Sequence, residues 1–401
     1  MSLQASQIFD VIIIGAGPAG SACAIELAKA APHVRIALLE KGVFPKDKIC
    51  GDALSPDVIN QVKMLSDDLA NKLDQSIHAL PVKGVRIFGR KKASYAYFFN
   101  ERNFLKSYTC PRLHLDSLLF EHTRLFPNIS FHGNHEVKDV QAHEEGVVVQ
   151  TATARFEGKM VLGADGAHSV VARRLGRIVM DKDYHAGGLR VYYEGVRGLA
   201  ENLIELHFMP EVLPGYLWIF PLPEGRANVG LGMTSRQISK DNIHLRERLQ
   251  HILEHHPVMK ERFAAATAME SVKGFGLPLG GKSNSISGQR YLLLGDAASL
   301  IDPLTGEGIG NAIRSGRVAA EHFLKCLTNN DFSAQHNRAY DQEIYRRMMP
   351  EFKLDYRIRQ LIYFFPASID LFVYLACKMK GFRTNLMDYY IRFHKFVSRS
   401  R

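Results

Sequence analysis

Residues 9–20 read FDVIIIGAGPAG, and this stretch decides the fold. Its first half is an apolar run of Ile and Val, which is typical of a buried parallel strand. The run leads into the glycine pattern of residues 15–20, and residues 21–30, rich in Ala, Leu and Glu, predict a helix. A strand, a tight turn and a helix in this order are the context in which GxGxxG indicates a dinucleotide-binding site.

Each glycine of this pattern meets a physical requirement. Gly15 permits the turn, Gly17 lets the backbone approach a pyrophosphate, and Gly20 lets the helix and the strand pack closely. Pro18 and Ala19 open the helix, whose free N–H groups and positive dipole end attract phosphates. The expected cofactor contacts therefore begin with these five residues.

A second strand is expected over residues 35–39, and it ends at Glu40. Glu40 follows Gly20 by twenty residues, a position from which a carboxylate can accept hydrogen bonds from ribose hydroxyls. We count Glu40 and its neighbour Lys41 among the expected cofactor contacts. These features predict a dinucleotide without choosing between FAD and NAD.

Two later segments again place glycine after a strand. Residues 160–168 read MVLGADGAH, so a short apolar strand leads to Asp165-Gly166. Residues 291–313 read YLLLGDAASLIDPLTGEGIGNAI, where a strand meets Gly295-Asp296 and a glycine-rich loop precedes a helix. In this order the three motifs resemble those of the FAD-dependent family built like p-hydroxybenzoate hydroxylase.

That resemblance implies FAD as the cofactor. It also implies that Asp296 binds the ribityl chain, and that the loop holding Gly306, Gly308 and Ile309 runs beside the isoalloxazine ring. A glycine-rich turn that opens a helix directs N–H donors at the flavin edge that becomes negative on reduction. Residues 111–116, PRLHLD, look like the family segment whose arginine reaches the cofactor, which adds Arg112.

Two more segments resemble the geranylgeranyl reductase family. They are residues 46–53, KDKICGDA, and residues 214–221, PGYLWIFP, and the continuation ANVGLG at residues 227–232 also fits. The resemblance covers residues 8–325 in outline. It implies an enzyme that saturates C=C bonds in the prenyl chains of lipids, quinones or chlorophyll precursors. Hydride would pass from reduced flavin to one alkene carbon, and a proton would reach the other.

The same resemblance implies roles for individual residues. Tyr216, Trp218 and Phe220 would line an apolar substrate pocket next to the flavin, the alternative being that they only fill the sheet core. Cys50 is the candidate catalytic residue, and Cys50 and Gly51 are also expected to contact the cofactor. A thiol there could hold the loop, tune the ring or donate a proton, whereas a buried inert cysteine is the alternative.

Other activities are compatible with the same fold. A monooxygenase would hydroxylate an aromatic or polyketide substrate, although Cys50-Gly51-Asp52 stands where many hydroxylases carry arginine and glycine. A halogenase would show a WxWxIP-like strand, from which YLWIFP departs. A membrane-surface flavin electron-transfer protein would usually bring an iron–sulfur cluster, which five scattered cysteines cannot supply. A flavin-binding scaffold without turnover is the remaining alternative.

Composition sets further bounds. The 401 residues, 46% hydrophobic and 23% charged, indicate an ordinary soluble globular protein of two or three domains. Five cysteines without a CxxC pair favour a reducing cytoplasm, and 17 histidines without HExxH give no reason to expect a metal.

No nucleic-acid partner is expected. Because the sequence holds one GxGxxG, electrons must arrive transiently, from NAD(P)H or a ferredoxin-type donor.

The C-terminal end is basic and rich in aromatic residues. Residues 340–401 hold twelve Lys and Arg against six Asp and Glu, out of a net charge of +10 for the chain. The apolar stretches 361–365 and 371–376 are short for a membrane span. Such a tail could lie on the anionic inner face of a membrane, or it could pack as a helical cap on the protein's own core.

The predicted architecture is α/β, with a Rossmann-like FAD-binding domain, an inserted substrate domain of mostly antiparallel sheet, and a helical C-terminal region. The FAD-binding domain is expected to be discontinuous, over residues 1–80, 105–178 and 285–325. The substrate domain is expected over residues 81–104 and 179–284, and the helical region over residues 326–401. Residues 235–266 carry the longest internal helical pattern.

Overall fold

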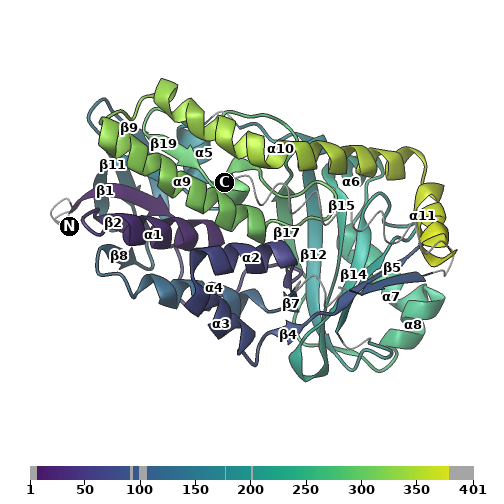
Figure 1. The fold of residues 1–401 in the computed structure, drawn as a ribbon. Helices are drawn as coiled ribbons and strands as arrows, with labels where there is room; N and C mark the ends of the chain where they lie inside the picture. Colours follow the sequence, from purple (N-terminus) through teal and green to yellow (C-terminus); the bar gives the residue numbers. More distant parts are fainter. Residues whose placement is uncertain (1–6, 91–93, 99–105, 177, 200–201, 379–401) are drawn as a thin grey trace.

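A computed structural model describes residues 7–90, 94–98, 106–176, 178–199 and 202–378. Two large sheets stand side by side, and helices cover the first sheet and one face of the second (Figure 1). The expected α/β class, with a dinucleotide-type sheet, an antiparallel sheet and a helical C-terminal region, is confirmed.

The first sheet has a parallel centre with the order β18-β19-β11-β1-β2-β8. Its central strand β1 is apolar on both faces, and Val11, Ile12 and Ile13 are fully buried, as expected where helices cover both sides. A meander of β9 and β10 adds antiparallel strands to the first half of β11. The strands are β1 Gln7–Ile14, β2 Ile36–Leu39, β8 Ile129–His132, β9 Val137–Ala142, β10 Val147–Thr151, β11 Arg155–Gly163, β18 Ser287–Gly288 and β19 Tyr291–Leu293.

Two helices start at the glycine turns of this sheet and pack on each other. Helix α1 spans Pro18–Ala30 and α9 spans Ile309–Asn329. They approach so closely that a side chain on Gly316 would overlap the Ala19 carbonyl oxygen. Helices α4 (Arg112–Thr123) and α5 (Val170–Arg174) complete this unit.

The second sheet runs in the order β16-β12-β15-β14-β13-β5-β6, with β17 also paired to β12. All its pairs are antiparallel except β13 with β5. Its strands are β5 Gly84–Phe88, β6 Ser94–Phe98, β12 His185–Glu194, β13 Leu203–His207, β14 Tyr216–Pro221, β15 Arg226–Thr234, β16 Thr267–Ala268 and β17 Lys273–Pro278. A third, small sheet of β3 (Ala53–Leu54), β7 (Tyr108–Thr109) and β4 (Leu80–Pro81) is accompanied by α2 (Pro56–Leu65) and α3 (Asp67–Asp74).

The helical pattern of residues 235–266 is not one helix. It forms α6 (Ser235–Lys240), α7 (Leu245–His255) and α8 (Pro257–Phe263). Pro257 has no N–H to continue α7, and it takes the first position of α8, where no N–H is needed. Leu249, Ile252 and Leu253 of α7 bury their side chains against the second sheet.

Helix α10 (Ala334–Phe364) extends from the first sheet to the second across the top of the molecule (Figure 1). Near its start the Tyr340 hydroxyl donates to the Leu293 carbonyl of β19 (2.8 Å). Near its end the Arg359 guanidinium donates to the Asp183 carbonyl, just before β12 (2.6 Å). Helix α11 (Ala367–Lys378) follows after Pro366, and the rest of the expected helical region, residues 379–401, lies outside the described residues.

The segments expected to belong to each domain supply the strands of the corresponding sheet. Residues 81–104 contribute β5 and β6 to the second sheet, and β5 pairs with β13 across a long stretch of sequence. The boundaries of the domains as independent units stay a prediction.

Candidate active site

The opening turn is built by contacts that only glycine allows. Gly15 has a φ of +99°, and a side chain there would overlap the Ala164 carbonyl oxygen. A side chain on Gly20 would overlap the Gly15 carbonyl oxygen. The turn therefore rests directly on the segment that carries Asp165-Gly166, so two motifs far apart in sequence form one surface.

Two other glycines face open space instead. A Cβ atom on Gly17 or Gly166 would meet nothing within 4 Å, so packing within the protein does not require glycine at Gly17. Beside them the Oδ1 oxygen of Asp165 is buried without a hydrogen-bond partner among the described residues. The first N–H groups of α1 also lack partners within the helix. In this open cradle the free N–H groups fit the phosphates of a dinucleotide cofactor, and the unpaired Asp165 oxygen fits a hydroxyl group of the same cofactor.

Glu40 has several partners within the protein, and its expected contact with a ribose stays a prediction. Its carboxylate accepts hydrogen bonds from the N–H groups of Ala16 (3.0 Å) and Gly42 (3.1 Å), and it pairs with Lys46. Burial alone would raise the pKa of Glu40. Lys46 and these N–H groups outweigh that effect, so the pKa lies below its usual value. Glu40 thus stays ionised and holds the opening turn in place. The side chain of Lys41 is exposed, and its contact with the cofactor stays a prediction.

The second glycine loop brings Asp296 to the start of α9. Gly295 packs between α1 and α9, and Asp296 forms an ion pair with Lys48 (2.9 Å). Burial raises the pKa of Asp296, but the nearby Lys48 and Arg112 keep it below its usual value. A Cβ on Gly308 would lie 3.6 Å from Asp296, and Ile309 is the buried first residue of α9.

Arg112 is buried and paired within its own helix. Its guanidinium forms two hydrogen bonds with the Asp116 carboxylate, each 2.7 Å long. It lies close enough to Cys50 and Asp296 for their charges to act on its pKa. The structure therefore brings Arg112 to the same region as the other expected residues, and its contact with the cofactor stays a prediction.

The aromatic strand β14 meets both loops. A Cβ on Gly51 would lie 3.1 Å from the Phe220 ring and 3.7 Å from the Trp218 indole nitrogen. At the other end the Tyr216 hydroxyl donates to the Thr305 carbonyl, next to Gly306. Neighbouring ring centroids along this row are 6.2 Å apart. The expected pocket residues therefore form one wall between the Cys50 loop and the Gly306 loop.

The side chain of Asn228 on β15 joins the Cys50 loop to this wall. It is fully buried, and its Nδ2 group donates to the Cys50 carbonyl and to the Asp52 carboxylate, both at 2.8 Å. Its Oδ1 atom accepts from the Trp218 indole N–H (2.9 Å). An indole can only donate, and a carbonyl and a carboxylate can only accept, so these partners fix the orientation of the amide.

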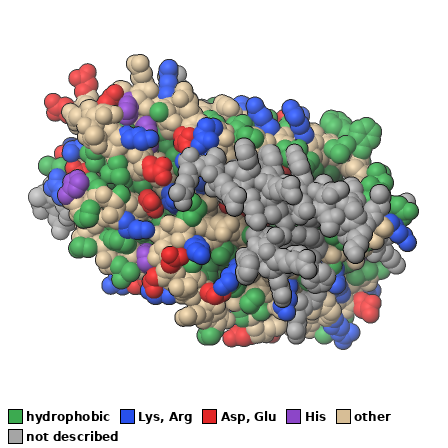
Figure 2. Space-filling model, viewed as in Figure 1, with side chains coloured by type: hydrophobic (Ala, Val, Ile, Leu, Met, Phe, Trp, Pro, Cys, Tyr) green, Lys and Arg blue, Asp and Glu red, His purple; other side chains and the backbone are tan. Residues whose placement is uncertain are grey.

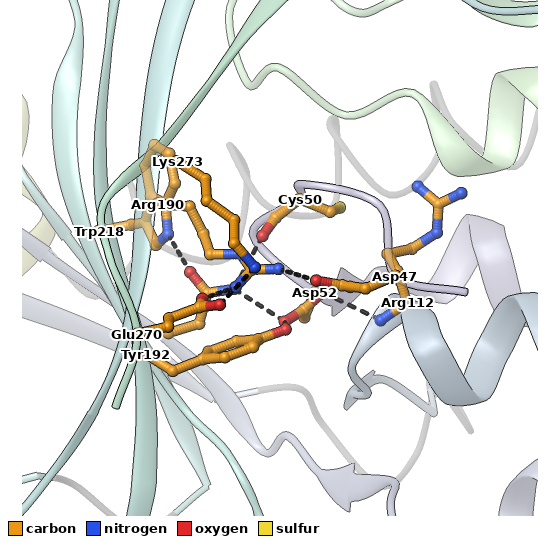
Figure 3. A network of polar contacts seen from close by, with 10 residues as sticks. Asp47, Cys50, Asp52, Arg112, Arg190, Tyr192, Trp218, Glu270 and Lys273 are labelled. Atoms are coloured by element: carbon orange, nitrogen blue, oxygen red, sulfur yellow. Dashed lines mark hydrogen bonds and ion pairs between the residues drawn. The ribbon is translucent and has the colours of Figure 1, made fainter. Parts of the chain in front are cut away.

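The same loop is held by strand β12 (Figure 3). The Tyr192 hydroxyl donates to Asp52 (2.7 Å), and the fully buried Arg190 bridges Asp47 (2.6 Å) and Glu270 while stacking on the Tyr192 ring. Burial raises the pKa of Asp52 to about 6, against the hydrogen bonds from Tyr192 and Asn228. Sequence reasoning missed this network. The one signal for it was a polar Asn228 inside the apolar run ANVGLG.

A carboxyl cluster supports the Gly306 loop from the α10 side. Asp302 accepts from the N–H groups of Leu304 (2.9 Å) and Thr305 (2.7 Å), which orders the loop. Side-chain oxygens of Asp302, Glu351 and Asp355 lie within 4.8 Å of one another. Burial, reinforced by the neighbouring acids, raises the pKa of Glu351 to about 8 and that of Asp355 to about 9.

This carboxyl cluster also bears on the expectation that no metal binds. Its three side chains offer oxygens at spacings that a metal ion could use. A second group, His322, Cys326 and His336, offers nitrogen and sulfur atoms in the same way. The absence of a metal therefore stays a prediction.

Comparison with known proteins places this geometry in a family. A family model described as an FAD binding domain matches residues 9–347. The chain is 31% identical over 325 residues to a menaquinone reductase of Mycolicibacterium smegmatis, covering 78% of this chain and 75% of that protein. It is 28% identical over 359 residues to a digeranylgeranylglycerophospholipid reductase of Thermoplasma acidophilum, covering 85% and 84%.

A solved structure has the same fold. A geranylgeranyl bacteriochlorophyll reductase-like protein from Thermoplasma acidophilum matches with a TM-score of 0.80 at 24% identity, covering 93% of this chain and 92% of that one. The expected resemblance, the fold type and FAD as the cofactor are confirmed, and the protein is an FAD-dependent oxidoreductase.

The position of Asp296 leads to a prediction about FAD affinity. Asp296→Ala should weaken FAD binding by about 10- to 100-fold, because a charged hydrogen-bond acceptor is lost. Titration of the apoprotein with FAD, followed by flavin fluorescence, measures the change. Asp241→Ala, at the exposed end of α6, is the control and should bind like the wild type. An Asp296→Ala protein that purifies yellow with stoichiometric flavin would contradict this role.

The fixed polarity at Asn228 allows a double-mutant cycle. Asn228→Asp should destabilise the fold by about 3 kcal/mol, because a carboxylate would face both Asp52 and the Cys50 carbonyl. Adding Asp52→Asn should recover most of this loss, since an amide at position 52 can donate to a carboxylate at position 228. Urea unfolding gives the free energies, and the emission of Trp218, the sole tryptophan, reports the local change. Equal stability of the single and double variants would contradict the proposed polarity.

The raised pKa of Asp355 predicts how stability changes with pH. The folded protein keeps a proton on Asp355 that the unfolded chain releases near pH 4, so this contribution is complete below that pH and is lost as pH rises through about 9. Asp355→Asn should flatten the fall in unfolding free energy between pH 5 and 8, by up to about 1.4 kcal/mol per pH unit. Urea unfolding at several pH values tests this, with Asp241→Asn as the exposed control. An unchanged slope in Asp355→Asn would show that another group titrates.

Proposed function

The chain belongs to the FAD binding domain family, and on that premise we propose that it is a geranylgeranyl reductase-like enzyme. Its reaction would saturate C=C bonds in the isoprenoid chain of a lipid or a quinone. The names of its relatives support this choice, since they are reductases of menaquinone and of a digeranylgeranyl lipid.

The aromatic wall of β14 is the observation that carries the proposal. Tyr216, Trp218 and Phe220 form a row of aromatic rings that contacts the Cys50 loop at one end and the Gly306 loop at the other. The indole N–H of Trp218 already donates to Asn228 within the protein, so Trp218 needs no hydrogen-bond acceptor on a substrate. A wall of this kind suits a hydrocarbon chain and excludes water from a reactive centre.

Reduction of an alkene needs a hydride and a proton. When bound, reduced FAD supplies the hydride. Cys50 is the proposed source of the proton, because burial raises the pKa of its thiol and Arg112 only partly offsets this effect. The S–H bond would break as the new C–H bond forms at the second alkene carbon, and solvent would then reprotonate the thiolate.

The electron donor is proposed to bind transiently. The sequence carries a single GxGxxG segment, which is used by the FAD cradle. NAD(P)H or a ferredoxin-type protein would therefore reduce the flavin and leave before or during turnover.

Turnover with a prenylated substrate tests the proposal. Protein with reduced flavin, incubated anaerobically with a geranylgeranyl lipid or menaquinone, should give products heavier by two hydrogen atoms for each saturated bond. Mass spectrometry of the products and the return of the oxidised flavin spectrum measure this. Oxygen uptake with a product heavier by one oxygen atom would instead identify a monooxygenase.

The same assay tests Cys50. Cys50→Ala should keep FAD and lower turnover by about 100-fold, in line with the loss of a positioned proton donor. Cys377→Ala, which removes an exposed thiol on α11, is the matched control and should turn over normally. A wild-type rate for Cys50→Ala would reduce Cys50 to a packing role.

A further inference from the structure

The corner between α10 and α11 exposes an unusual amount of apolar surface. Of the fifteen large hydrophobic side chains exposed in the described residues, six lie between Ile358 and Tyr374. The most exposed are Phe364 and Phe365, at 66% and 67%. Hydrophobic side chains gather at this corner in Figure 2. We call this set the apolar corner, and its members are Ile358, Leu361, Phe364, Phe365, Leu371 and Tyr374.

The spacing shows that the apolar corner is a face of each helix. On α10 its members Ile358, Leu361 and Phe364 are each three residues apart, and Phe365 follows directly after the helix. On α11 Leu371 and Tyr374 are three apart. Neither helix of the described chain is long and apolar enough to span a bilayer, and the two pass that test only together, with a bend of 110° between them.

The charge around the apolar corner is positive. Exposed Arg357 and Lys378 stand at its two ends, and Lys240 reaches the neighbouring Tyr363 ring. The one acidic residue from 357 to 378 is Asp370, which is neutralised by an ion pair with Arg90 (2.8 Å). An apolar face bordered by cations complements the surface of an anionic bilayer.

A cavity opens beside this face. Its volume is about 420 Å³, and Phe364 belongs both to the apolar corner and to the cavity wall. Pro214, Tyr356 and Tyr363 also line it, together with the polar side chains of Asp183, Thr234, Arg236, Gln237, Arg359 and Gln360. The Arg359 guanidinium donates to the Pro303 carbonyl of the Gly306 loop (3.0 Å). Pro214 lies two residues before Tyr216, so the cavity adjoins both the aromatic wall and the cofactor loop.

We propose that the apolar corner docks on an anionic lipid bilayer, and that the cavity beside it, lined by both polar and aromatic side chains, admits an amphipathic membrane-borne substrate. The docking stands on the exposed face and its flanking charges alone. The identity of the molecule that enters the cavity rests on the proposed function.

Vesicle co-sedimentation of the full chain tests the docking. The protein loaded with FAD should bind vesicles containing phosphatidylglycerol, and bind pure phosphatidylcholine vesicles less well. The double variant Phe365→Asp/Leu371→Asp should lower the bound fraction by about tenfold or more. Two side chains that would insert into the bilayer are replaced by carboxylates, which the anionic lipids repel. Neither residue lines the cavity.

A matched control separates this site from general surface charge. Ile77→Asp/Leu125→Asp replaces two hydrophobic residues of similar exposure, 83% and 61%, in the loops that follow α3 and α4, remote in sequence from the corner. It should bind vesicles like the wild type. Absence of wild-type binding, or equal loss in both double variants, would overturn the docking proposal. A dimer in analytical ultracentrifugation that only the corner variant dissociates would also overturn it, by assigning the face to a second copy.

Turnover measured in parallel keeps the two proposals apart. With substrate dissolved in detergent the corner variant should match the wild type, and with substrate in vesicles it should be about tenfold slower or worse. A wild-type protein that binds vesicles but reduces no prenyl substrate would refute the proposed function and leave the docking intact.

Discussion

The close contact between backbones at the opening turn is the constraint on which the rest of the structure depends. Gly15 and Gly20 allow the turn to touch the Ala164 segment and itself, and Gly316 lets α9 lie against α1. Any side chain at these positions would separate β1, β11, α1 and α9. Gly17 and Gly166, beside these contacts, face open space. The shape of the FAD cradle is thus a consequence of backbone packing, while the polar side chains around it set its electrostatic potential.

The sequence was informative where a function depends on residues close together in the chain. The glycine turns, the strands before them and the aromatic strand β14 all lie where their local patterns predicted. Glu40 was found at the right position, but its partner, the Ala16 N–H, depends on how two loops fold together. Pro257 was a local signal for a break within residues 235–266. The helical pattern on both sides of it led to the prediction of one long helical stretch. Asn228 was visible as a polar residue in an apolar run, but its partner Asp52 lies 176 residues away and could not be found in advance. The same holds for Asp355, whose neighbour Asp302 lies on a different element.

One consequence of these long-range contacts is that the Cys50 loop is shared between the two sheets. Residues 47–52 follow β2 of the first sheet, yet Arg190, Tyr192 and Asn228 of the second sheet hold them. The loop expected to contact the cofactor is therefore held by β12 and β15, and β15 in turn pairs with the aromatic strand β14. This arrangement buries Arg190 between two carboxylates, and burial raises the pKa of Asp52 to about 6.

Helix α10 has an implication for how the protein is made. The first sheet is complete only when β19, at residues 291–293, has paired with β11, and the Gly306 loop gains further support from the α10 residues Glu351, Asp355 and Arg359. A ribosome adding about 5–20 residues per second would release these residues well after β1, β2 and β11. Until then β11 lacks its pairing with β19, and the unpaired edge of an apolar strand invites aggregation. It follows that FAD capture is a late event in synthesis, and that truncation within α10 would impair the cofactor site before it touched any residue of the cradle.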